Sequence, residues 1–365
     1  MLEGETILKK PTAKRLIGAL AIALLISVTQ PITAAFIVPV CVVPVLISIL
    51  YAWAGWIPAA VASVGTVLSL TNLAVQMGLS EYAGLIALGC VCVLVLPAAV
   101  SCVLLEKRQP FFRRMAVSVF VQTAMLLGCV AVIYLGFKVD LVDAVIDLFS
   151  SAVLWMPEDA ILMLVQNFAM TGMLNAESME MIESGFLTGE QMAQLFAQAF
   201  DTMRYLYKLT MPAMLMSSSL LTGVLMTTVP GLICARRGDE PQVDYLPMSG
   251  WFMPSRMVGG LAVCLITGYA LQWMEVSGAE AAAMTISTLC GTALTLQGIA
   301  ALSRGLKQSG RKRGARIAMI LAGLALASTF VQIAGAMSAL FGRKGAISGW
   351  MRKRMEEKRK EDDEQ

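Results

Sequence analysis

The run from Leu16 to Ser80 contains no Asp, Glu, Lys or Arg, and this feature constrains the fold more than any other. Six further charge-free runs follow: Tyr82–Leu105, Met115–Phe137, Leu209–Ala235, Met257–Met274, Ala281–Ser303 and Ile317–Gly342. A helix that crosses a membrane needs about 20 mainly apolar residues. In hydrocarbon every backbone N–H and C=O must be bonded internally, which favours helices. The sequence therefore predicts an all-α fold, a polytopic transmembrane helix bundle.

The first charge-free run is too long for one helix, and proline and glycine residues interrupt it. We divide it into three segments, Leu16–Ala34, Phe36–Trp53 and Trp56–Met77. Together with the six later runs this makes nine hydrophobic segments, of which we expect eight or nine to cross the bilayer. The composition agrees, because 57% of residues are hydrophobic and only 15% are charged, against about a quarter in soluble domains.

Lys and Arg gather in clusters between the predicted spans. These clusters are Lys9, Lys10, Lys14 and Arg15; Lys107, Arg108, Arg113 and Arg114; Arg236 and Arg237; and the bases between Arg304 and Arg316. A cytoplasmic N-terminus places all of them inside the cell, as the positive-inside rule requires. We therefore predict a multi-pass protein of a bacterial cell membrane with its N-terminus in the cytoplasm. Nine crossings would put the basic C-terminal tail outside, which favours eight crossings and an inside tail.

One long polar segment, Lys138–Arg204, carries ten acidic residues and only two bases, Lys138 and Arg204. Its apolar residues recur at helical spacing, so we predict amphipathic helices on the extracytoplasmic side. They form either a structural cap or a lid over an outward-facing pocket. The predicted domains are thus a membrane bundle of five spans at 1–137, the acidic helical loop at 138–204, a second membrane bundle at 205–342 and a charged cytoplasmic tail at 343–365.

The chain contains no His, which excludes Ser-His-Asp triads, HExxH zinc sites and imidazole proton relays. The spans contain no acidic residues, no phosphate-binding loop occurs, and the eight cysteines lack metal-type spacing. We therefore expect no enzyme activity, no catalytic residue, no cofactor and no metal. An enzyme for lipid-linked substrates, using loop acids such as Asp140 or Glu158, is the disfavoured alternative.

Neutral polar residues remain inside the predicted spans. The candidates for contacting a solute are Asn72, Gln76, Gln122 and Gln297. Their alternative role is hydrogen bonding between helices. The bases Lys107, Arg108, Arg113 and Arg114, and Arg352, Lys353 and Arg354 in the tail, are predicted to lie at the membrane surface against anionic headgroups. No aromatic or fold-level signature of nucleic-acid binding accompanies these charges.

Several stretches occur in a familiar order. They are Val38-Pro39-Val40, Val43-Pro44-Val45, the turn at Gly55, Trp251–Pro254 and Thr295–Ala300, followed by a basic tail. In this order the chain resembles the YybS-like family of bacterial membrane proteins, a family of unknown function found largely in Firmicutes. The turn at Gly55 lacks the basic residue expected from that family, and the acidic loop is expanded.

The N-terminal half of that family is also distantly similar to the S subunits of energy-coupling-factor transporters. The resemblance implies a transporter-type substrate-binding subunit for a small neutral or vitamin-like solute, with cytoplasmic ATPases as partners in the lipid bilayer. Such a subunit needs neither an ATP motif nor a titratable residue at mid-membrane. The alternative is a non-transporting membrane scaffold or regulatory partner of other proteins.

Overall fold

The computed structural model describes residues 12–33, 38–76, 78–153, 156–171, 174, 189–237, 244–253, 255–274, 278–310 and 312–341. Within these ranges the secondary structure is helical. The elements are α1 Ala13–Thr33, α2 Val38–Ala54, α3 Trp56–Gln76, η1 Ser80–Tyr82, α4 Ala83–Cys90, η2 Val91–Val95, α5 Leu96–Glu106, α6 Phe111–Phe137, α7 Leu141–Val153, α8 Glu158–Met170, α10 Gly189–Arg236, η3 Met248–Gly250, α11 Ser255–Trp273, α12 Ala279–Gln308 and α13 Arg313–Phe341. The predicted all-α class is confirmed, and the chain is a polytopic helical membrane protein.

Five stretches of the described residues are long and apolar enough to cross a membrane. They are Trp56–Gln76, Ser80–Glu106, Phe111–Phe137, Gln194–Arg236 and Ala279–Gln308, and the bent pair Gly314–Leu324 and Thr329–Phe341 makes a sixth if it is one span. Two shorter apolar helices, Cys41–Ala54 and Met257–Trp273, accompany them. The sequence predicted eight or nine crossings, and their exact number stays a prediction.

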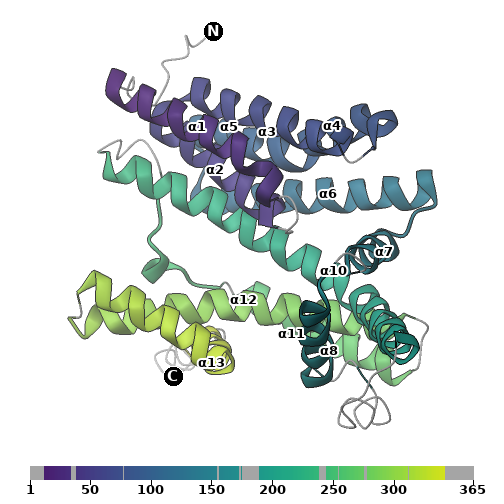
Figure 1. Cartoon of the computed structure of the whole chain (residues 1–365). Coiled ribbons are helices and arrows are strands. Elements are labelled where there is room, and N and C mark those ends of the chain that lie inside the picture. Colours follow the sequence, from purple (N-terminus) through teal and green to yellow (C-terminus); the bar gives the residue numbers. More distant parts are fainter. Residues whose placement is uncertain are drawn as a thin grey trace, which may run out of the picture. The chain divides into compact units, whose positions relative to one another are not determined.

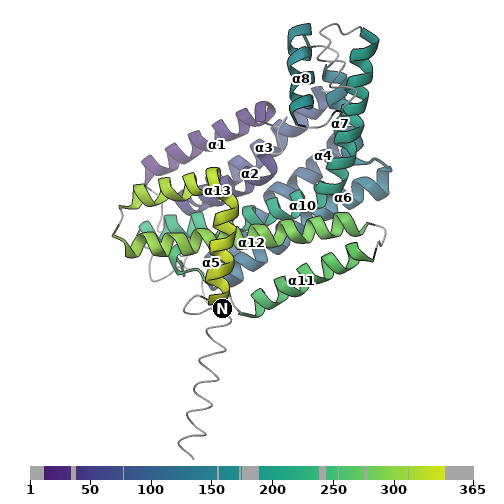
Figure 2. The same cartoon turned by 90° about the horizontal axis from the view of Figure 1, so that it is seen from below.

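The described chain forms two compact units, residues 1–126 with 215–365, and residues 127–214. The first unit combines residues of both predicted membrane bundles, and the second includes all of the predicted acidic loop. The four-part division into 1–137, 138–204, 205–342 and 343–365 stays a prediction. In Figure 1 the helices α1, α2 and α3 of the first unit pack side by side, as do α12 and α13. Figure 2 shows α11 running along α12.

Prolines and glycines explain the local shape of the first unit. Gly55 joins α2 to α3 with φ of +88°, a left-handed conformation that residues with a Cβ rarely adopt. The π-helical turn η2 ends two residues before Pro97, whose ring nitrogen has no hydrogen to donate to the carbonyl of Val93, four residues earlier. The side chain of Gln122 on α6 supplies a donor instead, with Nε2 at 3.4 Å from the Val93 oxygen.

Close helix approach holds α12 against α13. A Cβ built on Gly298 would lie 1.9 Å from the carbonyl oxygen of Val331, and one on Gly335 would lie 2.0 Å from that of Leu294. Only a residue without a side chain fits at either place. Lipid tails are as apolar as Leu, so membrane helices associate through this kind of close packing rather than through the hydrophobic effect.

The segment Asp244–Met253 runs along the first unit and is tied to it at both ends. The Asp244 carboxylate accepts a hydrogen bond from the backbone N–H of Phe111 at the start of α6 (2.8 Å), and Arg114 donates to the Asp244 carbonyl. Trp251 packs on Phe111, with ring centroids 5.5 Å apart. Its carbonyl accepts from Arg304 of α12 at 2.7 Å. The segment is therefore a packed part of the core rather than a surface loop.

The second unit has its own apolar core, built from α7, α8 and the first half of α10. Buried residues of all three helices form it: Val142, Ile146, Val153, Val165, Phe168, Leu195, Ala199 and Phe200. Phe168 and Phe200 meet edge-on with centroids 6.1 Å apart. The prediction of amphipathic helices in this region is confirmed. The helix α10 continues without a break from Gly189 to Arg236, across the predicted end of the loop at Arg204.

Ion pairs cover one side of this second core. Lys208 contacts Asp140 (3.1 Å) and Asp143 (2.8 Å), and Arg204 pairs with Asp147 and with Asp143 at 3.8 Å. Asp140, Asp143 and Asp147 thus lie on one helical face, since the same two bases meet all three. These pairs are largely exposed to solvent, so each contributes little to stability.

Candidate functional site

The four neutral residues proposed to contact a solute differ in burial, and none of them lines either of the two pockets described below. Asn72 and Gln76 near the end of α3 are exposed, whereas Gln122 and Gln297 are buried with exposed fractions of 1% and 4%. Gln297 makes a complete set of structural contacts, since its Oε1 accepts from the backbone N–H of Met253 (3.1 Å) and its Nε2 donates to Ser338 Oγ (3.2 Å). Its geometry is that of a residue that joins helices.

Gln122 is the least satisfied of the four. Its amide nitrogen bonds the Val93 carbonyl, but Oε1 is buried and has no hydrogen-bond partner among the described residues. Ser118, one helical turn earlier on α6, has a buried hydroxyl that also has no hydrogen-bond partner among the described residues. Neither side chain lines a described pocket. These two residues form a buried polar seam along α6.

The residues predicted at the membrane surface divide into two groups. Lys107, Arg108 and Arg113 are exposed at the turn between α5 and α6. Arg114 does not lie at the surface, because its side chain is only 2% exposed and holds the Asp244 carbonyl. The neighbouring Phe111 ring lies 6.0 Å from its guanidinium. The tail residues Arg352, Lys353 and Arg354 lie outside the described residues.

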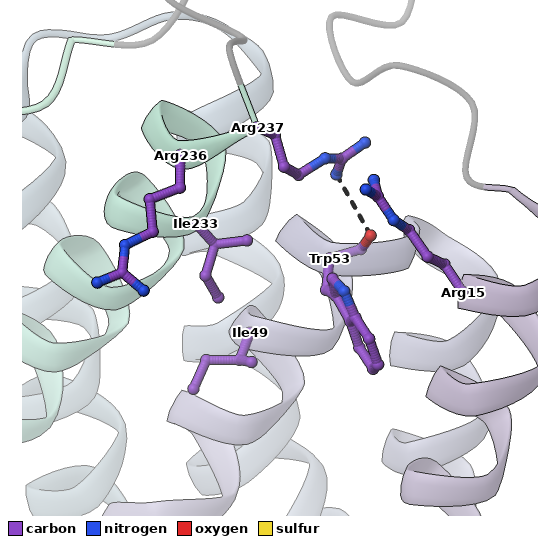
Figure 3. A pocket seen from close by; sticks show the side chains of 6 residues that line it. All are labelled: Arg15, Ile49, Trp53, Ile233, Arg236 and Arg237. Atoms are coloured by element: carbon purple, nitrogen blue, oxygen red, sulfur yellow. Dashed lines mark hydrogen bonds between the residues drawn. The ribbon is translucent and has the colours of Figure 1, made fainter.

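A pocket of about 480 Å³ opens where three helices of the first unit end. Arg15 comes from the first turn of α1, Ile49 and Trp53 from the end of α2, and Ile233, Arg236 and Arg237 from the end of α10. Figure 3 shows the guanidinium groups of Arg15 and Arg237 facing one another above Trp53, with Arg236 on the other side of Ile233. We call this site the arginine pocket.

The end of α2 explains why Arg237 is held in place. The last carbonyls of a helix have no donor within the helix, and basic side chains commonly satisfy them. Arg237 Nη1 donates to the carbonyl oxygens of Ala52 (2.7 Å) and Trp53 (3.3 Å). Gly55 then turns the chain away. On the facing helix, Gly18 carries no side chain and lets α1 approach the Trp53 indole, whose nearest atom is 3.7 Å from a Cβ built there.

The arginine pocket has a strongly positive wall. Within the described ranges no carboxylate lies within 4 Å of the guanidinium groups of Arg15 or Arg236, since all ion pairs found there belong to Arg204 and Lys208. Guanidinium groups bind carboxylates and phosphates through paired hydrogen bonds. Arg15 and Arg236, beside apolar side chains, can hold an anion that carries an apolar part.

A second hollow, of about 350 Å³, lies along the second half of α6. Its walls are Ala131, Val132, Leu135 and Gly136, which offer no side-chain hydrogen-bonding group. Among the described residues no group of three or more His, Cys, Asp or Glu is placed to hold a metal ion. The arginine pocket is therefore the better candidate for a site with chemistry.

From the sequence, Arg15, Arg236 and Arg237 contributed only to the predicted membrane topology. A signal for the site was nevertheless present, because the same assignment places the start of the first span, the Gly55 turn and the end of the sixth span at one side of the membrane. Basic residues at span ends on the same side of the membrane can lie close together. Which of them meet depends on how the helices pack, and sequence spacing carries no information about that.

Comparison with known proteins gives one match. The family model described as "Predicted membrane protein (DUF2232)" matches residues 19–338. The search of curated proteins and the search of solved structures each found no match.

Proposed function

The chain belongs to this family of predicted membrane proteins, and we propose that it is a transporter-type membrane subunit that binds a small anionic solute in the arginine pocket. The observation that carries the proposal is the convergence of Arg15, Arg236 and Arg237 on one pocket of about 480 Å³. That volume lies within the range of about 300–1,000 Å³ that is usual for small-molecule sites.

The chemistry of the pocket favours a different type of solute from the one expected from the sequence. Asn72, Gln76, Gln122 and Gln297 favoured a neutral solute, but none of them lines the arginine pocket. Three arginines favour a vitamin-like molecule that carries a negatively charged group. The apolar side chains of Ile49, Trp53 and Ile233 accommodate its remaining part.

The proposal includes a cytoplasmic N-terminus in a bacterial cell membrane, so that the arginine pocket faces the cytoplasm. Energy for transport then comes from separate ATPases, as in the energy-coupling-factor transporters that the YybS-like resemblance suggests. It assigns no catalytic residue and no cofactor. The charge-free runs of the predicted spans support it, because a pump that is driven by protons or sodium usually keeps an ionisable group at mid-membrane.

The test is to purify the full-length protein in a mild detergent and to identify co-purified small molecules by native mass spectrometry. A bound ligand raises the melting temperature in proportion to the logarithm of its concentration. We expect an anionic solute that stabilises the wild-type protein and not Arg15→Gln or Arg236→Gln. Arg113→Gln is the matched control, because Arg113 is exposed on α6 and lies outside the pocket. Equal stabilisation of all variants would contradict the proposal.

A non-transporting scaffold or regulatory partner is the second candidate. The exposed cluster Lys107, Arg108 and Arg113 favours it, since these bases project from the α5–α6 turn on the same proposed side as the arginine pocket. A triple change of these residues to Gln would then abolish binding of the partner protein and leave solute binding unchanged. Loss of solute binding through Arg15→Gln, with partner binding intact, would favour the transporter role instead.

A further inference from the structure

Pro230 interrupts the hydrogen bonding of α10 shortly before the helix ends at Arg236. Its ring nitrogen has no hydrogen to donate to the carbonyl oxygen of Met226, four residues earlier. The hydroxyl of Ser101 on α5 donates to that oxygen instead, at 3.2 Å. Met226 and Ser101 are 1% and 4% exposed, so the contact is shielded from solvent. A side chain of another helix therefore replaces the backbone donor that α10 lacks.

The hydroxyl of Ser101 has a second acceptor on its own helix. Several buried hydroxyls of the described chain donate to the carbonyl four residues earlier, as Ser63 does to Ala59 at 2.8 Å. For Ser101 that carbonyl belongs to Pro97. Rotation about its Cα–Cβ bond transfers the hydroxyl from α10 to α5, and the hydroxyl keeps one hydrogen bond in either position.

The carbonyl of Met226 likewise has a second donor. The next backbone N–H beyond Pro230 belongs to Gly231, five residues after Met226, and a bond between them makes a π-helical turn. Such a turn already lies beside a proline in this structure, since η2 ends two residues before Pro97. The hydrogen bonds of this region therefore have two discrete arrangements, which wind α10 differently at Pro230.

The part of α10 before Pro230 is held by close packing. A Cβ built on Gly223 would lie 2.7 Å from the Cα of Val119 on α6, so the two helices touch there. Proline and glycine have the lowest helix propensities, and Gly231 directly follows Pro230. Sharp bends in helices are most often found at proline. The terminal segment, residues 231–236, is thus joined to a fixed helix at its weakest point.

This terminal segment carries one wall of the arginine pocket. Ile233 and Arg236 lie on it, as Figure 3 shows on the last turns of α10. Arg15 belongs to α1, which has no part in the contacts around Pro230. A change of direction at Pro230 therefore moves Ile233 and Arg236 relative to Arg15 and alters the width of the pocket.

The end of α2 is tied to the same segment. Arg237 donates to the carbonyl oxygens of Ala52 (2.7 Å) and Trp53 (3.3 Å), which joins the ends of the two helices. α2 contains Pro44, and its two pocket residues, Ile49 and Trp53, both follow that proline. Each of the two helices therefore has a proline between its middle and the pocket.

We propose that the ends of α2 and α10 form a gate of the arginine pocket, which swings at Pro44 and Pro230 and which Ser101 holds through Met226. When the Ser101 hydroxyl turns to Pro97, the carbonyl of Met226 takes the N–H of Gly231 and the terminal segment changes direction. The hinge is a property of the helices alone. Its role as a gate rests on the proposed function, because the gate regulates access to the same pocket.

Hydrogen exchange of the full-length protein in detergent tests the hinge without a ligand. We expect Ser101→Ala to speed the exchange of the backbone amides of residues 231–236 about threefold, as the loss of one average hydrogen bond between membrane helices implies. Residues 215–226 should be unaffected. Ser63→Ala is the matched control, because its hydroxyl is also buried but bonds within its own helix.

Pro230→Ala separates a hinge from an ordinary contact. It returns the backbone donor to Met226, so in this background Ser101→Ala should no longer change the exchange of residues 231–236. Faster exchange along the whole of α10 in Ser101→Ala is what a merely structural contact gives, and it would overturn the hinge. So would unchanged exchange of residues 231–236.

Benzoate, an anion with an apolar ring, tests the gate. Bound between Arg15 and the terminal segment, it should slow the exchange of residues 231–236 in the wild-type protein and not in Arg15→Gln. If benzoate raises the melting temperature of the wild type but not of Arg15→Gln, and leaves this exchange unchanged, the gate is overturned and the anion-binding function stands. If it has neither effect, the gate and that function are both overturned.

Discussion

The amide nitrogen of Gln122 donates to the carbonyl oxygen of Val93, the acceptor whose helical donor is missing because of Pro97. This contact joins α6 to the π-helical turn in the middle of a predicted span. An unsatisfied carbonyl in hydrocarbon costs several kcal/mol, so a side chain from another helix takes over the role of the lost backbone donor.

Replacing Gln122 with Met is expected to lower stability by about 1 kcal/mol, since hydrogen bonds between membrane helices contribute about 0.6–2 kcal/mol. The loss is partly offset because the unpartnered Oε1 is removed as well. Thermal denaturation in detergent measures the change. Gln76→Met, on the exposed end of α3, serves as control. In a Pro97→Ala background, where the backbone donor returns, the effect of Gln122→Met should shrink, and an undiminished effect would contradict the explanation.

Replacing Gly298 with Ala is expected to destabilise the contact between α12 and α13. The new Cβ would lie 1.9 Å from the Val331 oxygen, so the two helices must separate. Overpacking of this kind costs about 1–3 kcal/mol. Gly305→Ala on the same helix has open space around it and should be neutral or slightly stabilising. Equal melting temperatures for the two variants would rule out the close approach.

Replacing Phe200 with Ala is expected to cost about 3–5 kcal/mol of stability in the second unit, as is usual for a large aromatic side chain in a core. Phe200 is 7% exposed and contacts the rings of Phe149, Phe168 and Phe196. Tyr205→Ala, at a position 59% exposed on the same helix, should have little effect. Hydrogen exchange of the backbone amides of α7 and α8 measures the stability of the second unit in both variants. Unchanged protection in Phe200→Ala would show that this core does not hold the helices together.

The acidic helix start at Asp140 is expected to weaken in acid. Burial by itself raises the pKa of the Asp140 carboxyl, but hydrogen bonds from Lys208 and from the backbone N–H groups of Val142 and Asp143 outweigh it and hold that pKa below its ordinary value. A pKa that is lower in the folded state gives stability that is complete above the unfolded value of about 3.9 and is lost as the pH falls through the folded value.

Neutral pH therefore lies on the plateau, and the melting temperature should fall only below about pH 4. Asp140→Asn should remove part of this acid dependence, and the effect is small because solvent screens a partly exposed group. Circular dichroism melts between pH 3 and 7 measure it. A wild-type and a variant curve that run parallel over this whole range would show that Asp140 does not contribute.

The sequence by itself determined that the chain is a helical membrane protein. Long runs without charge leave the backbone no partner other than itself, and a helix satisfies that requirement locally. Helical spacing likewise places Asp140, Asp143 and Asp147 on one face, because it is a local property of the chain. The amphipathic helices of the second unit followed from their helical periodicity, whereas their shared core did not.

Only the tertiary structure decided which polar residues are buried and which of them meet. Lipid tails are as apolar as the side chains of a neighbouring helix, so apolar residues occur all round a membrane helix and do not mark its inner face. Sequence therefore treated Asn72 and Gln122 alike, although one is exposed and the other is 1% exposed. Arg15 and Arg237 are 222 positions apart (237 − 15) and line one pocket because the start of α1 lies beside the ends of α2 and α10. That convergence is a property of helix packing, and it creates the arginine pocket.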